Sequence, residues 1–126
     1  MKSPLHIELA SDCLRVLSHS LLAVRPQEGC ALLLGDERQS SSFKQAKIFR
    51  VQMIWPCCNI WSINISGLRD STKEINENKQ NISSKKNRFA IDPREQLLAQ
   101  RWARKQNWRV LGSAHSHPQG APIPSL

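Results

Sequence analysis

The sequence has no long hydrophobic run and no hydrophobic leader. Its longest apolar stretches, Leu21–Val24 and Ala31–Leu34, are far shorter than the about 20 residues that a membrane-spanning helix requires. Pro4, Glu8 and Asp12 interrupt the first residues, so the apolar region of a secretory signal peptide is missing. These absences predict a protein that neither spans a membrane nor is exported.

The sequence also has no Cys-x-x-Cys pair, which excludes a four-cysteine zinc knuckle. Cys57 and Cys58 are adjacent, and adjacent cysteines rarely bond to each other. Cys13 and Cys30 fall in apolar segments, where buried free thiols are common. We therefore expect a reduced protein of the cytoplasm rather than a disulfide-linked one.

The length of 126 residues fits one domain, and we expect that domain to span residues 1–126. The chain carries 18 Lys and Arg against 10 Asp and Glu. Most of this excess lies in residues 69–126, which hold 11 basic and 5 acidic side chains. Such a basic region attracts nucleic acids and acidic proteins alike, and a solvated basic face is a simpler interpretation than nucleic-acid binding.

The first half of the sequence predicts one helix and two strands. Ser11 and Asp12 can cap a helix that ends before Pro26 and carries an apolar stripe of Leu14, Leu17 and Leu21. The run over residues 28–34, apolar after Glu28 and closed by Gly35 and Asp36, is typical of a buried strand. A second strand is expected over residues 47–55, because β-branched and aromatic residues are frequent there and Pro56 follows.

Residues 66–87 differ in composition from the rest of the chain. Asn, Ser, Lys, Glu and Gln dominate this segment, and few of its side chains are apolar. Such a segment buries too little apolar surface to offset the entropy of ordering it. We therefore expect a flexible polar insertion over residues 66–87.

A helix and a strand are expected after this insertion. Asp92, Pro93 and Glu95 suit the N-cap, first and third positions of a helix that ends near Asn107. Its predicted inward residues are Leu97, Leu98, Trp102 and Ala103. Residues 108–114 then form a strand that leads into His115-Ser116-His117-Pro118. The order of elements predicts an α/β fold, a mixed central β-sheet flanked by helices.

His115 and His117 are the sharpest candidates for chemistry. Side chains alternate along a strand, so two histidines separated by one residue point to the same side. Two imidazoles in that arrangement can bind one metal ion, although a pair of exposed histidines at a strand end has the same spacing. Pro118 stops the strand and opens the site to a loop.

Glu28 is a second candidate, because it precedes an apolar strand in which an uncompensated charge is costly. It can serve as a general base whose pKa is tuned by apolar surroundings, or it can cap the backbone or pair with an arginine. Ser125 follows His117 after seven intervening residues, and a serine there carries little meaning by itself.

Taken together, Glu28, His115-Ser116-His117-Pro118 and Ser125 resemble the motif of the JAMM (MPN+) zinc metallopeptidases, the JAB domain family. The likeness runs from about Leu14 to Leu126 apart from the polar insertion, and it is greatest to the prokaryotic branch. The resemblance implies the MPN/JAB fold, a cytidine-deaminase-like sandwich.

The same resemblance implies a catalytic mechanism and a substrate class. His115 and His117 would bind Zn²⁺, Glu28 would act as the general base, and Ser125 would donate a hydrogen bond to the oxyanion. Substrates in the family are peptide or isopeptide bonds that follow a Gly-Gly tail of a ubiquitin-like protein. In bacteria these are ubiquitin-like sulfur-carrier proteins, and a tail without side chains can enter a narrow groove as an extended strand.

One part of the family motif lies beyond the sequence. The third zinc ligand is an aspartate three residues after the serine, which would follow Leu126, so the fold is expected to be incomplete at the C-terminus. Three interpretations stay open: a piece of an active enzyme, an inactive MPN-like interaction module, or a site completed by another carboxylate such as that of Leu126. A DNA-associated protein of the RadC-like branch is a further alternative, which rests only on the basic second half.

Overall fold

The computed structural model describes residues 5–39, 46–61 and 89–118. Within these ranges the chain forms one sheet of four strands and two helices, in the order β1 (Leu5–Leu9), α1 (Ser11–Leu22), β2 (Cys30–Gln39), β3 (Lys47–Cys57), α3 (Pro93–Lys105) and β4 (Arg109–His115). The predicted insertion over residues 66–87 and the candidate Ser125 lie outside the described residues.

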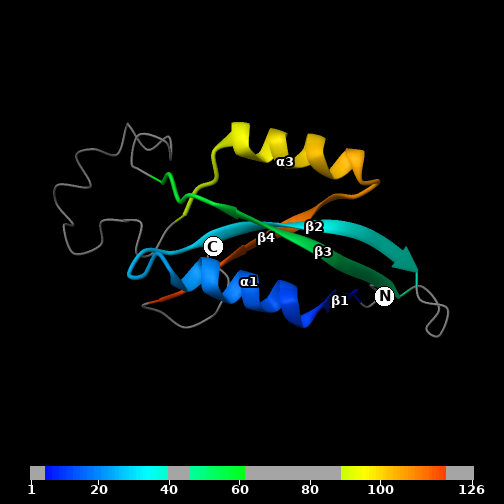
Figure 1. The fold of residues 1–126 in the computed structure, drawn as a ribbon, viewed down its shortest axis with the longest axis horizontal. Coiled ribbons are helices and arrows are strands. Elements are labelled where there is room, and N and C mark those ends of the chain that lie inside the picture. Colours follow the sequence, from blue (N-terminus) through cyan, green and yellow to red (C-terminus); the bar gives the residue numbers. More distant parts are fainter. Residues whose placement is uncertain (1–4, 40–45, 62–88, 119–126) are drawn as a thin grey trace.

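The sheet has the strand order β1-β3-β2-β4. β1 is parallel to β3, whereas β2 is antiparallel to both β3 and β4, so the sheet is mixed. The two helices lie on opposite sides of the sheet, α1 below it and α3 above it in the view of Figure 1. The predicted α/β class, with helices flanking a mixed central sheet, is confirmed.

β2 lies between β3 and β4 and is buried on both faces, which explains its nearly continuous apolar sequence. Leu32 and Leu34 pack with Ala99 and Ala103 of α3, whereas the alternate residues Ala31 and Leu33 pack toward α1. The strand is longer than expected and continues to Gln39. β3 likewise passes through Pro56, because a proline is tolerated where β1 no longer pairs with that edge.

α3 begins as the sequence predicts but turns a different face to the sheet. The Asp92 side chain accepts a hydrogen bond from the Arg94 N–H at 2.9 Å, and Glu95 accepts one from Trp55 Nε1 at 2.7 Å. Ala99 and Ala103 are fully buried, whereas Leu97 and Leu98 are 47% and 52% exposed. The prediction of these two leucines as inward residues is wrong, because the buried face of α3 runs through Ala99 and Ala103, one helical turn apart, and positions 97 and 98 lie away from it.

The end of α3 connects the helix tightly to β4. Asn107 has a φ of 60°, a left-handed conformation that asparagine tolerates better than most residues. The Asn107 N–H donates to the Arg104 carbonyl at 3.0 Å, and the Trp108 N–H donates to the Ala103 carbonyl at 2.8 Å. This Schellman arrangement satisfies the last helical carbonyls and starts β4 at Arg109.

β1 was not expected from the sequence. Its five residues pair with β3 only, and Leu5 and Ile7 are 53% and 59% exposed. Neither described helix is long and apolar enough to cross a membrane.

Candidate metal and catalytic site

Two imidazoles meet at the end of β4. His115 is the last residue of the strand, and His117 follows it by two positions. Their Nε2 atoms are 2.8 Å apart, and their ring centroids are 4.7 Å apart. Phe89 stacks on the His115 ring with a centroid distance of 4.4 Å and an interplanar angle of 24°. The two ring nitrogens that the sequence places on one side of the strand therefore converge on one point.

Burial lowers the pKa of His115 below its ordinary value of 6.5. The Glu28 carboxylate acts in the opposite direction, and His117 adds to the lowering. His115 is therefore a neutral imidazole at pH 7, and a neutral imidazole has the nitrogen lone pair that binds a metal ion.

Glu28 lies just before β2, and it is the buried acidic residue of the described chain, with 3% exposure. Its backbone carbonyl accepts a hydrogen bond from Asn59 Nδ2 at 3.0 Å. Its side-chain Oε2 is buried and has no hydrogen-bond partner among the described residues. A buried carboxylate oxygen without a partner is costly, so this atom indicates a polar group that binds beside Glu28.

Ser116 joins the histidines to the Glu28 segment. The Gly29 N–H donates to Ser116 Oγ at 2.8 Å, and the Ser116 N–H donates to the Gly29 carbonyl at 3.0 Å. Since Gly29 follows Glu28 directly, this pair of bonds fixes the glutamate beside the end of β4. The residue between the two histidines thus has a positioning role, which the His-x-His pattern alone does not reveal.

Asn59 is a second positioning residue that the sequence analysis did not single out. Besides donating to the Glu28 carbonyl, its Oδ1 accepts hydrogen bonds from the N–H groups of Trp61 at 3.0 Å and Ala90 at 3.1 Å. Asn59 therefore connects the end of β3, the start of β2 and the segment that precedes α3. A polar residue two positions after the end of β3 is a weak signal for such a role.

Two cysteines border the site without joining it. Cys30 pairs with His115 on one side and with Cys57 on the other, across three neighbouring strands. Burial raises the pKa of both thiols to about 11, so both remain protonated at neutral pH. All four cysteines of the chain are free, in agreement with the expectation that the protein contains no disulfide framework.

The chemistry of the described residues can be compared with what a metal ion requires. Two convergent imidazole nitrogens and a buried carboxylate oxygen without a partner suit a metal ion together with a water molecule. No group of three or more His, Cys, Asp and Glu side chains suited to a metal ion is found within residues 5–39, 46–61 and 89–118. The described residues therefore supply two imidazole nitrogens of a chemistry that suits a metal ion, and fewer than the three protein ligands of a catalytic zinc site. Ser125, the predicted oxyanion donor, lies outside the described residues.

Comparisons with known proteins show the family of the chain. The solution structure of protein DSY2949 from Desulfitobacterium hafniense is similar, with a TM-score of 0.59 and 28% sequence identity over 94% of this chain. The match spans 62% of the length of that structure. A search of curated proteins gives no match. The family model described as prokaryotic homologs of the JAB domain matches residues 10–126, and the chain therefore belongs to that family.

Proposed function

We propose that this domain is a zinc-dependent metallopeptidase that hydrolyses the amide bond following a Gly-Gly tail of a ubiquitin-like sulfur-carrier protein. The observation that carries the proposal is the convergence of His115 and His117 beside the unpartnered carboxylate oxygen of Glu28. Membership in the JAB family supports it. The free cysteines support a cytoplasmic location.

In this proposal His115 and His117 would hold the zinc ion. When bound, zinc would supply Lewis-acid polarisation of a water molecule and of the scissile carbonyl. Glu28 takes the proton from the attacking water and delivers it to the leaving amine. Glu28 is buried, Asn59 donates to its backbone carbonyl, and Ser116 accepts a hydrogen bond from the N–H of the next residue, Gly29, so these bonds position the glutamate.

Ser125 is proposed as the donor of a hydrogen bond to the oxyanion of the tetrahedral intermediate. Donors of this kind contribute about 3–4 kcal/mol to transition-state stabilisation in comparable sites. The Gly-Gly tail is proposed because it has no side chains, so it can lie flat beside the edge of a sheet as an added strand.

The test is cleavage of a fusion in which a sulfur-carrier protein ending in Gly-Gly is followed by a reporter. The assay uses residues 1–126 and a form extended through the aspartate of the family motif, each with added zinc. We expect cleavage after Gly-Gly that Glu28→Gln abolishes. Cleavage that persists in Glu28→Gln, or its absence in the extended form, contradicts the proposal.

A protein-binding role without catalysis makes a different prediction for the same materials. Gly-Gly-tailed protein would then bind in the presence of a chelator, and the fusion would stay intact in the extended form. Measuring binding and cleavage on the same preparations separates the two functions.

A further inference from the structure

Phe89 covers one face of the His115 ring, beside the two convergent imidazole nitrogens. The ring centroids of Phe89 and His115 are 4.4 Å apart, and the two rings are within 24° of parallel. Contacts between aromatic rings at about this separation are favourable beyond the area that they bury. A near-parallel ring at this distance leaves little room for the imidazole to turn about its Cβ–Cγ bond. Phe89 therefore restricts the plane of the His115 ring.

The plane of a histidine ring depends on contacts of this kind. The torsion about the Cβ–Cγ bond has broad preferences, so β4 places the His115 imidazole without fixing its plane. The nitrogen lone pair that binds a metal ion lies in the ring plane, and a rotation of the ring turns the lone pair away from the ion. In metal sites the neighbours of a ligating histidine hold its ring in orientation.

The main chain beside Phe89 is hydrogen-bonded to the segment that follows β3. The N–H of the next residue, Ala90, donates to Asn59 Oδ1 at 3.1 Å. The Ala90 carbonyl accepts a hydrogen bond from the Ile60 N–H at 3.0 Å. Because both polar main-chain groups of Ala90 are satisfied there, the Phe89 ring is placed by reference to the sheet.

Asn59 links this arrangement to Glu28. Its Nδ2 donates to the Glu28 carbonyl at 3.0 Å, while its Oδ1 accepts from the Ala90 N–H. One side-chain amide therefore holds two segments in place. The first carries the candidate general base, and the second carries the ring that stacks on a candidate metal ligand.

We propose that Phe89 is a positioning residue that sets the plane of the His115 imidazole and keeps its Nε2 directed toward His117 Nε2. Asn59 fixes the Phe89 segment relative to Glu28, so one connected set of contacts orients the metal ligand and the general base. Both residues act through a neighbouring group rather than on the reacting atoms. The inference rests on the proposed function, because it takes His115 as a metal ligand.

The first test is the NMR spectrum of the His115 ring in the metal-free protein. An aromatic ring shields protons that lie over its face, so the His115 ring protons should resonate upfield of those of the exposed His19. Phe89→Leu and Phe89→Met keep an apolar side chain without a flat ring, and both should move the His115 resonances downfield. Phe89→Tyr keeps the stacked ring and should leave these resonances in place.

The second test is the zinc affinity of the form extended through the motif aspartate, measured by competition with a chelator of known affinity. Phe89→Leu and Phe89→Met should weaken zinc binding by about 10- to 100-fold, as the loss of a group that orients a metal ligand does elsewhere. Phe89→Tyr should retain tight binding, because the flat ring rather than its exact composition holds the imidazole.

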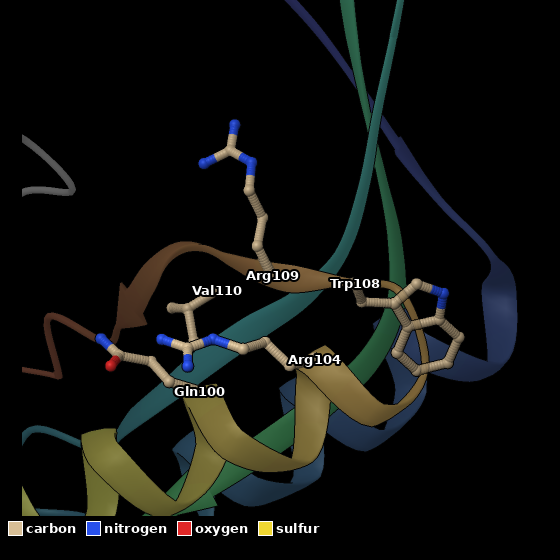
Figure 2. Close-up of a pocket in the computed structure, with 5 residues that line it drawn as sticks. All are labelled: Gln100, Arg104, Trp108, Arg109 and Val110. Atoms are coloured by element: carbon tan, nitrogen blue, oxygen red, sulfur yellow. The ribbon is translucent and has the colours of Figure 1, made fainter.

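Trp108→Leu is the matched control for general destabilisation. Trp108 lies just before β4, at the opposite end of that strand from His115, and contacts Trp102 with ring centroids 5.8 Å apart. It also lines a pocket between α3 and β4 (Figure 2). The substitution should lower stability but change neither the His115 resonances nor the zinc affinity of the folded protein. A loss of zinc affinity equal to that of Phe89→Leu would overturn the proposal.

A double-mutant cycle tests the connection through Asn59. Asn59→Ala should weaken zinc binding, because the Phe89 segment loses the acceptor of the Ala90 N–H. Adding Phe89→Leu to this variant should cost less affinity than it costs alone, since both substitutions remove the same restraint on the His115 ring. Losses that simply multiply would overturn the connection between Asn59 and the ring.

Failure of this inference and failure of the proposed function are distinguishable. Unmoved His115 resonances or an unchanged zinc affinity in Phe89→Leu and Phe89→Met would overturn the positioning role, whatever the cleavage assay gives. Zinc binding that depends on the ring, in an extended form that cleaves no Gly-Gly fusion, would reject the peptidase and keep the positioning role. No zinc binding by the unsubstituted extended form would reject both.

Discussion

Glu28 and His115 influence each other across the start of β2 and the end of β4. The lowered pKa of His115 reflects burial first, and the negative charge of Glu28 partly offsets this effect. Because the folded pKa is below the unfolded value of 6.5, the unfolded chain binds protons more readily in acid. Stability of the metal-free protein should therefore fall as the pH drops below 6.5 through the folded pKa.

Glu28→Gln is expected to lower the pKa of His115 further, because the charge that favours the imidazolium is removed. The measurement is an NMR titration of the His115 ring in metal-free protein. Glu8→Gln removes the same charge from β1, at the far edge of the sheet, and should leave the midpoint unchanged. A midpoint that rises in Glu28→Gln would show that the carboxylate does not face the ring.

Ser116→Ala is expected to destabilise the protein by about 1–3 kcal/mol, because the Gly29 N–H loses its acceptor in a partly buried position. Urea denaturation measures the loss. Ser113→Ala, at an exposed position of β4 three residues earlier, is the control and should change stability by less than about 0.5 kcal/mol. Equal effects of the two substitutions would contradict a positioning role for Ser116.

At the level of elements, Gly29 allows α1 and the start of β2 to approach each other. A Cβ at this position would lie 2.5 Å from the Leu21 carbonyl oxygen and 2.7 Å from the Leu21 Cα, both backbone atoms. The absence of a side chain is therefore required by the packing of α1 beside Glu28.

Gly29→Ala should cost about 1–3 kcal/mol of stability, because the backbone of α1 or β2 must shift. It should also weaken zinc binding, since Glu28 and the end of β4 move with Gly29. Gly112→Ala is a matched control, because a Cβ there meets nothing within 4 Å. The measurement is the thermal unfolding of both variants. A Gly29→Ala protein as stable as the unsubstituted protein would show that Leu21 does not pack as closely against Gly29 as described.

The orientation of α3 can be tested by truncating leucines inside and outside the core. Leu34 is fully buried under this helix, so Leu34→Ala should cost about 2–5 kcal/mol. Leu97→Ala removes the same atoms from the exposed side of α3 and should change stability by less than about 0.5 kcal/mol. A large loss of stability in Leu97→Ala would contradict this orientation and would indicate that Leu97 faces the sheet, as the sequence pattern predicted.

Local signals in the sequence predicted some elements well and others poorly. The start of α3 was predictable because Asp92 and Pro93 act on their own neighbours. The inward face of α3 was not predictable, because the exposed Leu97 and Leu98 have the spacing of an apolar stripe. β1 was not predicted because it is only five residues long and its Leu5 and Ile7 side chains are exposed. This strand depends on its pairing with β3, which the local sequence does not show.

The same distinction holds for the site. The spacing of His115 and His117 is local, so their shared side of the strand followed from strand geometry. The roles of Ser116 and Asn59 depend on bonds to residues 87 and 31 positions away along the chain. Such contacts exist only after folding, and a local pattern does not contain them.

On the scale of the whole molecule, the residues of the candidate site all lie at one end of the sheet. The start of β2, the end of β3 and the end of β4 meet there, as their register shows. This brings Glu28, Asn59 and the His pair together although they are far apart in sequence. Helices on both faces of the sheet bury the central strand β2.

Zinc stoichiometry tests the central claim most directly. Equilibrium dialysis against Zn²⁺ at pH 7.5, followed by elemental analysis, is applied to the form extended through the motif aspartate and to its His115→Ala, His117→Ala, Glu28→Gln and His19→Ala variants. We predict one zinc per chain that either site-histidine substitution removes, with binding retained in Glu28→Gln and in the exposed-helix control His19→Ala. Zinc bound equally well by His115→Ala and His117→Ala, or no zinc bound by the unsubstituted protein, would contradict the account.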